Sequence, residues 1–381
     1  MDFALSEEQQ SIFEMARDFG QARLAPNALA WEAEGTIPKE LWRDVAELGL
    51  GGIYVSEEYG GSALSRLDGT LIFEALAMAD PSVGSFLSIH NMCGGMIEAS
   101  GDADAKARWL PRLCAMETIF SYCLTEPGSG SDAAALRTRA SRTNDGWRLD
   151  GTKAFISGGG YSDAYLTMVR TGEDGPRGIS AVIVEAGTPG LSFGQPEDKM
   201  GWRAQPTAQV QFDDCVVPAQ NLLGEEGRGF RYAMAGLDGG RLNISAGALG
   251  GAQAALDATL AYMGERKAFG QSLDQFQALQ FRLAEMETAL QSARIFLRQA
   301  AWKLDTGAPD AGRFCAMAKL HVTDRAFEVA NQCLQLHGGY GYLADYGIEK
   351  IVRDLRVHQI LEGTNEIMRL IIARGLLAER G

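Results

Sequence analysis

The chain has 381 residues, of which 46% are hydrophobic and 22% charged; this composition is typical of a soluble globular protein with roughly two or three domains. Thirty-five basic residues stand against forty-nine acidic ones, and the net charge of −14 without a basic run excludes the electrostatic footprint of a nucleic-acid-binding protein. We therefore expect no nucleic acid among its partners. A polyanionic ligand would need a few well-placed arginines and backbone amides, because the overall field opposes it.

Cysteine and histidine patterns give no indication of a metal or redox-dithiol site. The six cysteines contain no C-x-x-C pair and the four histidines no H-E-x-x-H motif, so we predict neither zinc nor a redox dithiol. The chain opens Met1-Asp2-Phe3-Ala4-Leu5 without a basic segment, and no run approaches the ~20 apolar residues of a membrane span. We expect no membrane association and a cytoplasmic location, or the mitochondrial matrix if the source is eukaryotic.

The first third of the chain is predicted to be helical. Ser6-Glu7-Glu8-Gln9 is a capping-box pattern, and apolar residues then repeat at helical spacing from Ile12 to Phe19. Residues 39–49, 68–79 and 85–118 are rich in Ala, Leu and Met. We predict an N-terminal α-helical domain over residues 1–118.

From about Ile119 the pattern changes to one typical of strands. Apolar and polar residues alternate over residues 135–140, and Asn144-Asp145-Gly146 then precedes Trp147, which predicts a β-hairpin. Further strand candidates are residues 154–157, 165–170, 179–184 and 209–212. Because no helical segment intervenes, we predict a small antiparallel β-domain over residues 119–226.

The remainder returns to long segments rich in Ala, Leu and Gln. These segments cover approximately residues 230–263, 275–304, 309–336 and 364–378, which predicts a four-helix bundle over residues 227–381. The predicted fold class is therefore α+β multidomain, with helical, β and helical-bundle domains in that order.

Residues 122–132 have the composition of a ligand-binding loop. A strand-like entry leads into Pro127, Gly128 and Gly130, whose backbone conformations favour a tight turn, and hydroxyl side chains surround them. Such a turn suits a phosphate or a flat polar ring. The same composition also fits an ordinary surface turn.

Glu362 is the candidate catalytic residue. It follows Ile360 and Leu361 at the start of a predicted helix, where partial desolvation would raise the pKa of the carboxyl toward the range of a general base. The alternative is a carboxylate stabilised by the helix N-terminus.

Five separated motifs occur in the order seen in the acyl-CoA dehydrogenases, and the chain resembles that family over essentially its whole length. The motifs are residues 122–132, Phe155-Ile156-Ser157-Gly158, Arg266-Lys267-Ala268-Phe269-Gly270, Gln335 to Gly339, and Glu362-Gly363-Thr364. Ser65-Arg66-Leu67-Asp68, Ile89-His90-Asn91-Met92-Cys93 and Ile360-Leu361-Glu362-Gly363 resemble the short branched-chain branch. The chain departs from the commoner family pattern at Phe155, where many members carry Trp, and at His337.

The resemblance implies the acyl-CoA dehydrogenase fold and a non-covalent FAD between the β-domain and the bundle, completed by a neighbouring subunit of a homotetramer. The residues implied to bind FAD are Tyr122, Cys123, Leu124, Thr125, Glu126, Pro127, Gly128, Ser129, Gly130, Ser131, Phe155, Ile156, Ser157, Arg266, Phe276, Gln277, Gln335, Leu336, His337, Gly338, Gly339, Thr364, Asn365 and Glu366. Of these, Arg266, Phe276, Gln277 and residues 335–339 would reach the flavin of the partner. Ser131, Asp238, Gly239, Gly240, Arg241 and Arg374 are implied to contact the substrate.

The implied reaction is α,β-dehydrogenation of a short branched-chain acyl-CoA such as isobutyryl-CoA, a step of valine breakdown, with an electron-transfer flavoprotein as acceptor. Glu362 would remove the α-proton. Some relatives carry this base at the position of Gly240, which in this chain cannot act. Alternatives are a 2-methylbutyryl-CoA or straight-chain acyl-CoA dehydrogenase, an acyl-CoA oxidase or flavin monooxygenase, and a non-catalytic flavin-binding protein.

Overall fold

The computed structural model describes residues 4–379; Met1 to Phe3, which open the predicted N-terminal domain, and the last two residues of the chain lie outside it. The first part is helical, as predicted. Its helices are α1 (Glu7–Phe19), α2 (Ala28–Glu34), α3 (Leu41–Glu47), α4 (Arg66–Ala77), α5 (Pro81–Ser100) and α6 (Ala103–Cys114). The predicted capping box is present: the Ser6 hydroxyl accepts from the amide of Gln9, whose side chain accepts from the Ser6 amide.

The β-domain is one eight-stranded sheet in the order β6-β7-β3-β2-β4-β5-β8, with β1 paired to β4. Its strands are β1 (Phe120–Cys123), β2 (Arg139–Arg142), β3 (Trp147–Ser157), β4 (Ala164–Arg170), β5 (Ile179–Glu185), β6 (Leu191–Phe193), β7 (Thr207–Val217) and β8 (Leu222–Leu223). The predicted hairpin is β2–β3, closed by the pair Arg142 and Trp147. The segment expected as a separate strand at residues 154–157 is the end of the long β3.

Most pairs in the sheet are antiparallel, but β1 and β2 both pair with β4 in parallel. The pairs run from Phe120–Ala164 to Cys123–Thr167 for β1, whereas β2 pairs with β4 at Arg139 and Arg170. The two strands therefore occupy successive parts of one edge of β4. The intervening residues 124–138, which include the predicted ligand loop, leave the sheet at this edge and return to it.

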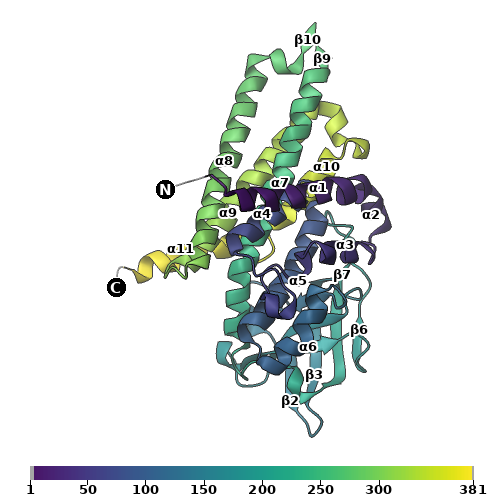
Figure 1. Cartoon of the computed structure of the whole chain (residues 1–381), viewed down its shortest axis with the longest axis vertical. Helices are drawn as coiled ribbons and strands as arrows, with labels where there is room; N and C mark the ends of the chain where they lie inside the picture. Colours follow the sequence, from purple (N-terminus) through teal and green to yellow (C-terminus); the bar gives the residue numbers. More distant parts are fainter. Residues whose placement is uncertain (1–3, 380–381) are drawn as a thin grey trace.

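Three long helices follow the sheet and lie side by side in Figure 1: α7 (Gly229–Glu265), α8 (Gln277–Asp305) and α9 (Ala311–His337). A small hairpin of β9 (Lys267–Ala268) and β10 (Gln271–Ser272) joins α7 to α8 at the end of the molecule opposite the sheet. Two shorter helices, α10 (Ile348–Arg356) and α11 (Asn365–Ala378), complete the chain.

The fourth helix of the predicted bundle is placed differently from the expectation. The segment 364–378 forms α11, but this helix packs on α9 and extends away from the bundle, whereas α4 of the N-terminal part packs against α7 and α8. The apolar periodicity of α11 could not show which helix it packs on, because periodicity identifies the buried face of a helix but not the element that covers this face.

The hydrophobic core joins the three parts of the chain. One cluster of buried residues connects α3, α4 and α5 with α7, α8 and α9, and a second connects α5 and α6 with one face of the sheet. Helix α5 belongs to both clusters. Among residues 4–379, no helix combines the length and hydropathy needed to cross a membrane, and no group of three or more His, Cys, Asp or Glu side chains is arranged to hold a metal ion.

Candidate active site

Glu362 lies in a tight turn just before α11, and its backbone is held in an unusual conformation. Glu362 has a φ of 55° and Gly363 a φ of 85°, so two consecutive residues adopt the left-handed region. For a residue with a side chain this conformation costs on the order of 1–3 kcal/mol and persists only where the surroundings enforce it. Arg241 donates to the carbonyl of Glu362 at 3.4 Å, and Lys319 donates to the carbonyl of Gly363 at 2.9 Å.

The carboxylate of Glu362 points into the protein beside α7. Its Oε2 atom is buried and has no hydrogen-bond partner among the residues that the structure describes. A Cβ atom added at Gly240 would come within 2.8 Å of Oε2 and 3.1 Å of the sulfur of Met92. The glycine therefore leaves the space that the carboxylate occupies, and the two positions that can carry the base in the resembled family face each other here.

Burial raises the pKa of Glu362 to about 7, although the positive charges of Arg241 and Lys319 oppose the shift. A carboxylate with this pKa can accept a proton near neutral pH and release it again. An unpartnered buried oxygen is costly in a folded protein, so it indicates a site that a ligand completes.

Arg241, Asp238 and Gly239 line the same stretch of α7. Arg241 is 6% exposed and pairs with Asp238 at 2.6 Å, and burial raises the pKa of Asp238 against the charge of Arg241. Gly239 faces the guanidinium of Arg66, since a Cβ at this position would lie 2.5 Å from Nη1. Arg66 stacks on the ring of Tyr54 at 3.8 Å, and its buried Nη1 lacks a partner within residues 4–379.

The predicted ligand loop is a tight turn fixed by its own acidic residue. Glu126 and Ser129 exchange backbone hydrogen bonds of 2.9 and 3.1 Å, which places Pro127 and Gly128 at the exposed tip. The buried Glu126 carboxylate accepts from the amides of residues 137 and 138 and from Lys153 at 2.8 Å. Burial favours a higher pKa for Glu126, but Lys153 and these amides hold it below its ordinary value. Its side chain is therefore structural, and its backbone N–H and carbonyl are both used within the turn.

Successive side chains of β1 point to opposite faces of the sheet, so Tyr122 and Cys123 have different surroundings. Cys123 is fully buried in the sheet core, so its side chain cannot line a ligand site. Tyr122 is half-buried on the other face, and its buried hydroxyl has no partner in the described part of the chain. Gly128, Gly130 and Ser131 are exposed, and an added Cβ at either glycine would meet no atom of the described chain within 4 Å.

Phe155 is exposed on a bulge of β3 directly beside this loop. The pairing of β3 with β7 shifts between Lys153 and Ile156, and Phe155 has a φ of 58° and an exposed fraction of 68%. The amide of Ala154 donates to the carbonyl of Thr125 at 2.8 Å, which joins the two segments. Ile156 points into the core, while Ser157 is half-buried.

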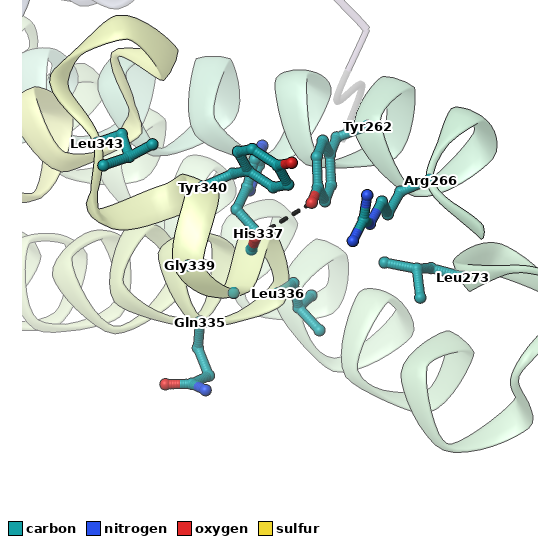
Figure 2. A pocket seen from close by; sticks show the side chains of 10 residues that line it. Tyr262, Arg266, Leu273, Gln335, Leu336, His337, Gly339, Tyr340 and Leu343 are labelled. Atoms are coloured by element: carbon teal, nitrogen blue, oxygen red, sulfur yellow. Dashed lines mark hydrogen bonds between the residues drawn. The ribbon is translucent and has the colours of Figure 1, made fainter. Parts of the chain in front are cut away.

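A large cavity of about 490 Å³ lies at the junction of α7 and α9. Figure 2 shows Tyr262 and Arg266 on one side of it and the residues around His337 on the other. The rings of Tyr262 and His337 stack at 4.4 Å, and the Tyr262 hydroxyl donates to the carbonyl of His337 at 3.2 Å. Arg266 lies over the ring of Tyr340 at 5.3 Å. Leu336, Gly338 and Gly339 line the cavity, whereas the side chain of Gln335 points away from Tyr262.

Apart from residues 364–366 at the start of α11, the structure places the predicted flavin residues in two separate groups. Residues 122–131 and 155–157 belong to the sheet, whereas Arg266 directly precedes the β9–β10 hairpin at the opposite end of the molecule (Figure 1). Phe276 and Gln277, at the start of α8, and residues 335–339 belong with Arg266. One chain does not bring the two groups together.

The start of α11 is only partly available to a cofactor. The Thr364 hydroxyl caps the helix by accepting from the amide of Ile367 at 3.3 Å. Asn365 is buried, and its side chain bonds to Lys319, Thr323 and Asp324. Its predicted cofactor contact is therefore restricted to the backbone. Glu366 and Arg374 are exposed on α11.

Comparison with known proteins identifies the family. Three acyl-CoA dehydrogenase models match this chain: the N-terminal domain over residues 6–117, the middle domain over residues 121–215 and the C-terminal domain over residues 227–377. The chain belongs to the acyl-CoA dehydrogenase family. The resemblance found in the sequence and the predicted three-part fold are confirmed.

Individual relatives agree with this membership. The chain is 54% identical to the mitochondrial isobutyryl-CoA dehydrogenase of Dictyostelium discoideum over 98% of this chain and 90% of that protein. The structure of butyryl-CoA dehydrogenase from Megasphaera elsdenii matches with a TM-score of 0.96 and 39% identity, covering 99% of this chain and 100% of the other. The structure of PigA with FAD and proline matches with a TM-score of 0.95 and 31% identity over all of both chains.

FAD is the cofactor of this acyl-CoA dehydrogenase, and the residues present fit it. The exposed ring of Phe155 beside open glycines can cover a flat ring system, and the exposed backbone of Gly128, Gly130 and Ser131 can face polar edges. Gln205 donates to the Ser157 hydroxyl at 3.2 Å, while its own Oε1 is buried without a partner in the described chain. The buried hydroxyl of Tyr122 is a second polar group without a partner in the described chain, and it lies near Glu362.

Two residues that matter here were missed from the sequence. Lys319 lies on α9 and Arg66 on α4. Lysine and arginine side chains on helices usually reach solvent, so the sequence did not single them out. Arg66 is part of the motif Ser65-Arg66-Leu67-Asp68, but the sequence predicted no role for its side chain. No signal within the sequence placed either cation beside the Glu362 turn or beside Gly239, because both contacts join segments far apart in the chain.

Proposed function

We propose that this acyl-CoA dehydrogenase oxidises a short, α-methyl-branched acyl-CoA, isobutyryl-CoA first and 2-methylbutyryl-CoA second, and that Glu362 is the α-proton base. The observation that carries the proposal is the buried, unpartnered Oε2 of Glu362 opposite Gly240, together with a pKa of about 7. The product from isobutyryl-CoA is methacrylyl-CoA, which places the enzyme in valine breakdown.

In the proposed mechanism, Glu362 accepts the α-proton of the thioester. This proton is too weakly acidic for a carboxylate unless the carbonyl oxygen is hydrogen-bonded as negative charge develops. The family resemblance assigns this role to the backbone N–H of Glu362, in a turn whose carbonyls are held by Arg241 and Lys319. Bound FAD would supply the acceptor for the hydride that leaves the β-carbon.

The surroundings of Glu362 support a short acyl group. The guanidinium of Arg66 fills the space between Gly239 and Gly95, while the sulfur of Met92 lies next to Gly240. These bulky groups occupy space between α5 and α7 at Gly239 and at Gly240, the residue that faces the Glu362 carboxylate. The 54% identity to a protein named isobutyryl-CoA dehydrogenase supports the same substrate class.

A second copy of the chain is proposed to complete the flavin site, within a homotetramer built as a dimer of dimers. The separation of Arg266 and the cavity around His337 from the sheet supports this arrangement (Figure 1). Phe281, Ile295 and Trp302 are exposed along α8 at multiples of seven residues, so they lie on one face of the helix that a partner subunit can cover.

We propose an electron-transfer flavoprotein as the acceptor, on the resemblance to the family. The mitochondrial name of the Dictyostelium relative supports the mitochondrial matrix as the location if the source is a eukaryote, and the cytoplasm otherwise.

The substrate proposal predicts that isobutyryl-CoA has a kcat/KM at least about 10-fold above that of octanoyl-CoA, since each methylene in an apolar pocket discriminates by ~1–3 kcal/mol. The measurement is a panel of saturated acyl-CoAs assayed with a ferrocenium acceptor and, separately, with oxygen. A higher kcat/KM on octanoyl-CoA would refute the substrate, and equal rates with oxygen and ferrocenium would indicate an oxidase.

A further inference from the structure

Lys319 lies on α9 directly behind the Glu362 turn, and it is fully buried. Its ammonium group donates to the carbonyl of Gly363 at 2.9 Å and to the side-chain oxygen of Asn365 at 2.8 Å. Both acceptors are uncharged. A buried ammonium is normally paired with a carboxylate, because desolvation of an isolated charge is costly. No carboxylate of residues 4–379 forms a hydrogen bond or an ion pair with Lys319. The cost of burying its charge is therefore not offset by a directly bound carboxylate, which indicates a functional role.

We propose that Lys319 is a positioning residue for Glu362: its ammonium group fixes the Glu362–Gly363 turn through the carbonyl of Gly363, and its positive charge favours the ionised carboxylate. This inference rests on the proposed role of Glu362 as the base. It adds a residue on a different helix that acts on the base without contacting the substrate.

The geometry of the turn supports the positioning role. In this turn of two consecutive left-handed residues, the carbonyl of Glu362 faces α7 and that of Gly363 faces α9. One cation binds each carbonyl: Arg241 from α7 and Lys319 from α9. Without the ammonium group, the Gly363 carbonyl and the Asn365 side-chain oxygen would each lose a buried donor, and the strained turn could relax.

The electrostatic role follows from how the two cations are paired. Asp238 offsets the charge of Arg241 at 2.6 Å, whereas no carboxylate in the described part of the chain pairs with Lys319 in this way. The pKa of Lys319 is lowered to about 7, because burial lowers it by more than the charge of Glu362 raises it. The charge of Lys319 in turn lowers the pKa of Glu362. The other titratable or charged groups that face this pair are Arg241 on α7, Asp324 on α9, Glu366 on α11, His358 before α11, Tyr122 on β1 and Cys93 on α5.

Tyr122, Cys93 and His358 do not supply a charge near neutral pH. Burial raises the pKa of Tyr122 and Cys93 above their ordinary values and lowers the pKa of His358 to about 4. All three are therefore neutral where the base must work. Arg241 and Lys319 remain as the two cations that lower the pKa of Glu362, and Arg241 has the larger effect. Of the two, Lys319 is the one that no carboxylate of the described residues binds directly.

Two substitutions separate the roles of Lys319. Lys319→Gln keeps a side-chain donor for the Gly363 carbonyl but removes the charge, whereas Lys319→Met removes both. Wild-type flavin reduction by isobutyryl-CoA should fall as the pH drops through the pKa of Glu362, because the protonated carboxyl cannot accept a proton. In Lys319→Gln this edge should move up by about one pH unit or more, the shift typical of losing an opposite charge. Lys319→Met should show the same shift and a lower maximal rate.

The measurement is stopped-flow flavin reduction of the FAD-loaded enzyme as a function of pH, with thermal unfolding of each variant alongside. Thr323→Val is the matched control, because it removes a hydroxyl from the same cluster without changing charge, and it should keep the wild-type pH edge. A folded Lys319→Gln with an unshifted edge would overturn the proposal even if Lys319→Met fails to fold. If Glu362→Gln reduced flavin normally, the proposed base itself would be wrong, which distinguishes the two failures.

Discussion

Replacing Glu362 by glutamine should lower the rate of flavin reduction by isobutyryl-CoA by at least ~10²–10⁴-fold, the contribution of a positioned general base. Glutamine has the same size and can still form hydrogen bonds, but its amide cannot accept the α-proton. The variant should remain yellow and bind acyl-CoA, because Glu362 touches neither the loop of residues 122–132 nor the exposed Phe155 in a hydrogen bond of the described structure. Stopped-flow absorbance in the flavin band measures the rate directly.

Two controls make this prediction specific. Flavin content and acyl-CoA binding should be measured on the same preparation, since loss of either would point to misfolding instead of lost proton transfer. A double change of Glu362→Gly and Gly240→Glu should recover part of the activity, because a Cβ atom at position 240 would lie 2.8 Å from the carboxylate oxygen of Glu362. Near-normal flavin reduction by Glu362→Gln would show that the base lies elsewhere.

Replacing Arg266 by alanine should weaken FAD binding on the order of 10- to 100-fold, the effect of losing one hydrogen bond to a charged group. Arg266 is exposed in the single chain and borders the cavity around His337, so its side chain is free to reach a phosphate of a partner's cofactor. Fluorescence of released flavin after dilution measures the affinity. Lys267→Ala is the matched control, since Lys267 is the adjacent exposed cation on β9 and should leave FAD binding near wild type.

Mixing variants tests whether Arg266 acts across subunits. If a site combines Glu362 of one chain with Arg266 of another, co-expression of Arg266→Ala and Glu362→Gln chains should restore activity in mixed oligomers. Each mixed pair then contains one site with both native residues. Activity no higher than that of the two variants kept apart would show that Arg266 serves its own chain or no flavin at all.

The sequence by itself determined the features that depend on neighbouring residues. The Ser6–Gln9 capping box, the hairpin around Asn144–Gly146 and the long helices from Gly229 onward all rest on contacts within a few residues or on apolar periodicity. The position of Glu362 after two apolar residues likewise predicted a desolvated carboxyl with a raised pKa, and its pKa of about 7 agrees. The five motifs in order were sufficient to recognise the family.

Only the tertiary structure decided which distant segments meet. It placed α4 instead of α11 against α7 and α8, set β1 and β2 in parallel on one edge of β4, and brought Lys319 of α9 behind the Glu362 turn. It also committed the side chains of Glu126 and Asn365 to internal hydrogen bonds. Periodicity shows which face of an element is buried but not what covers it, and a buried cation looks like a surface cation until its neighbours are known.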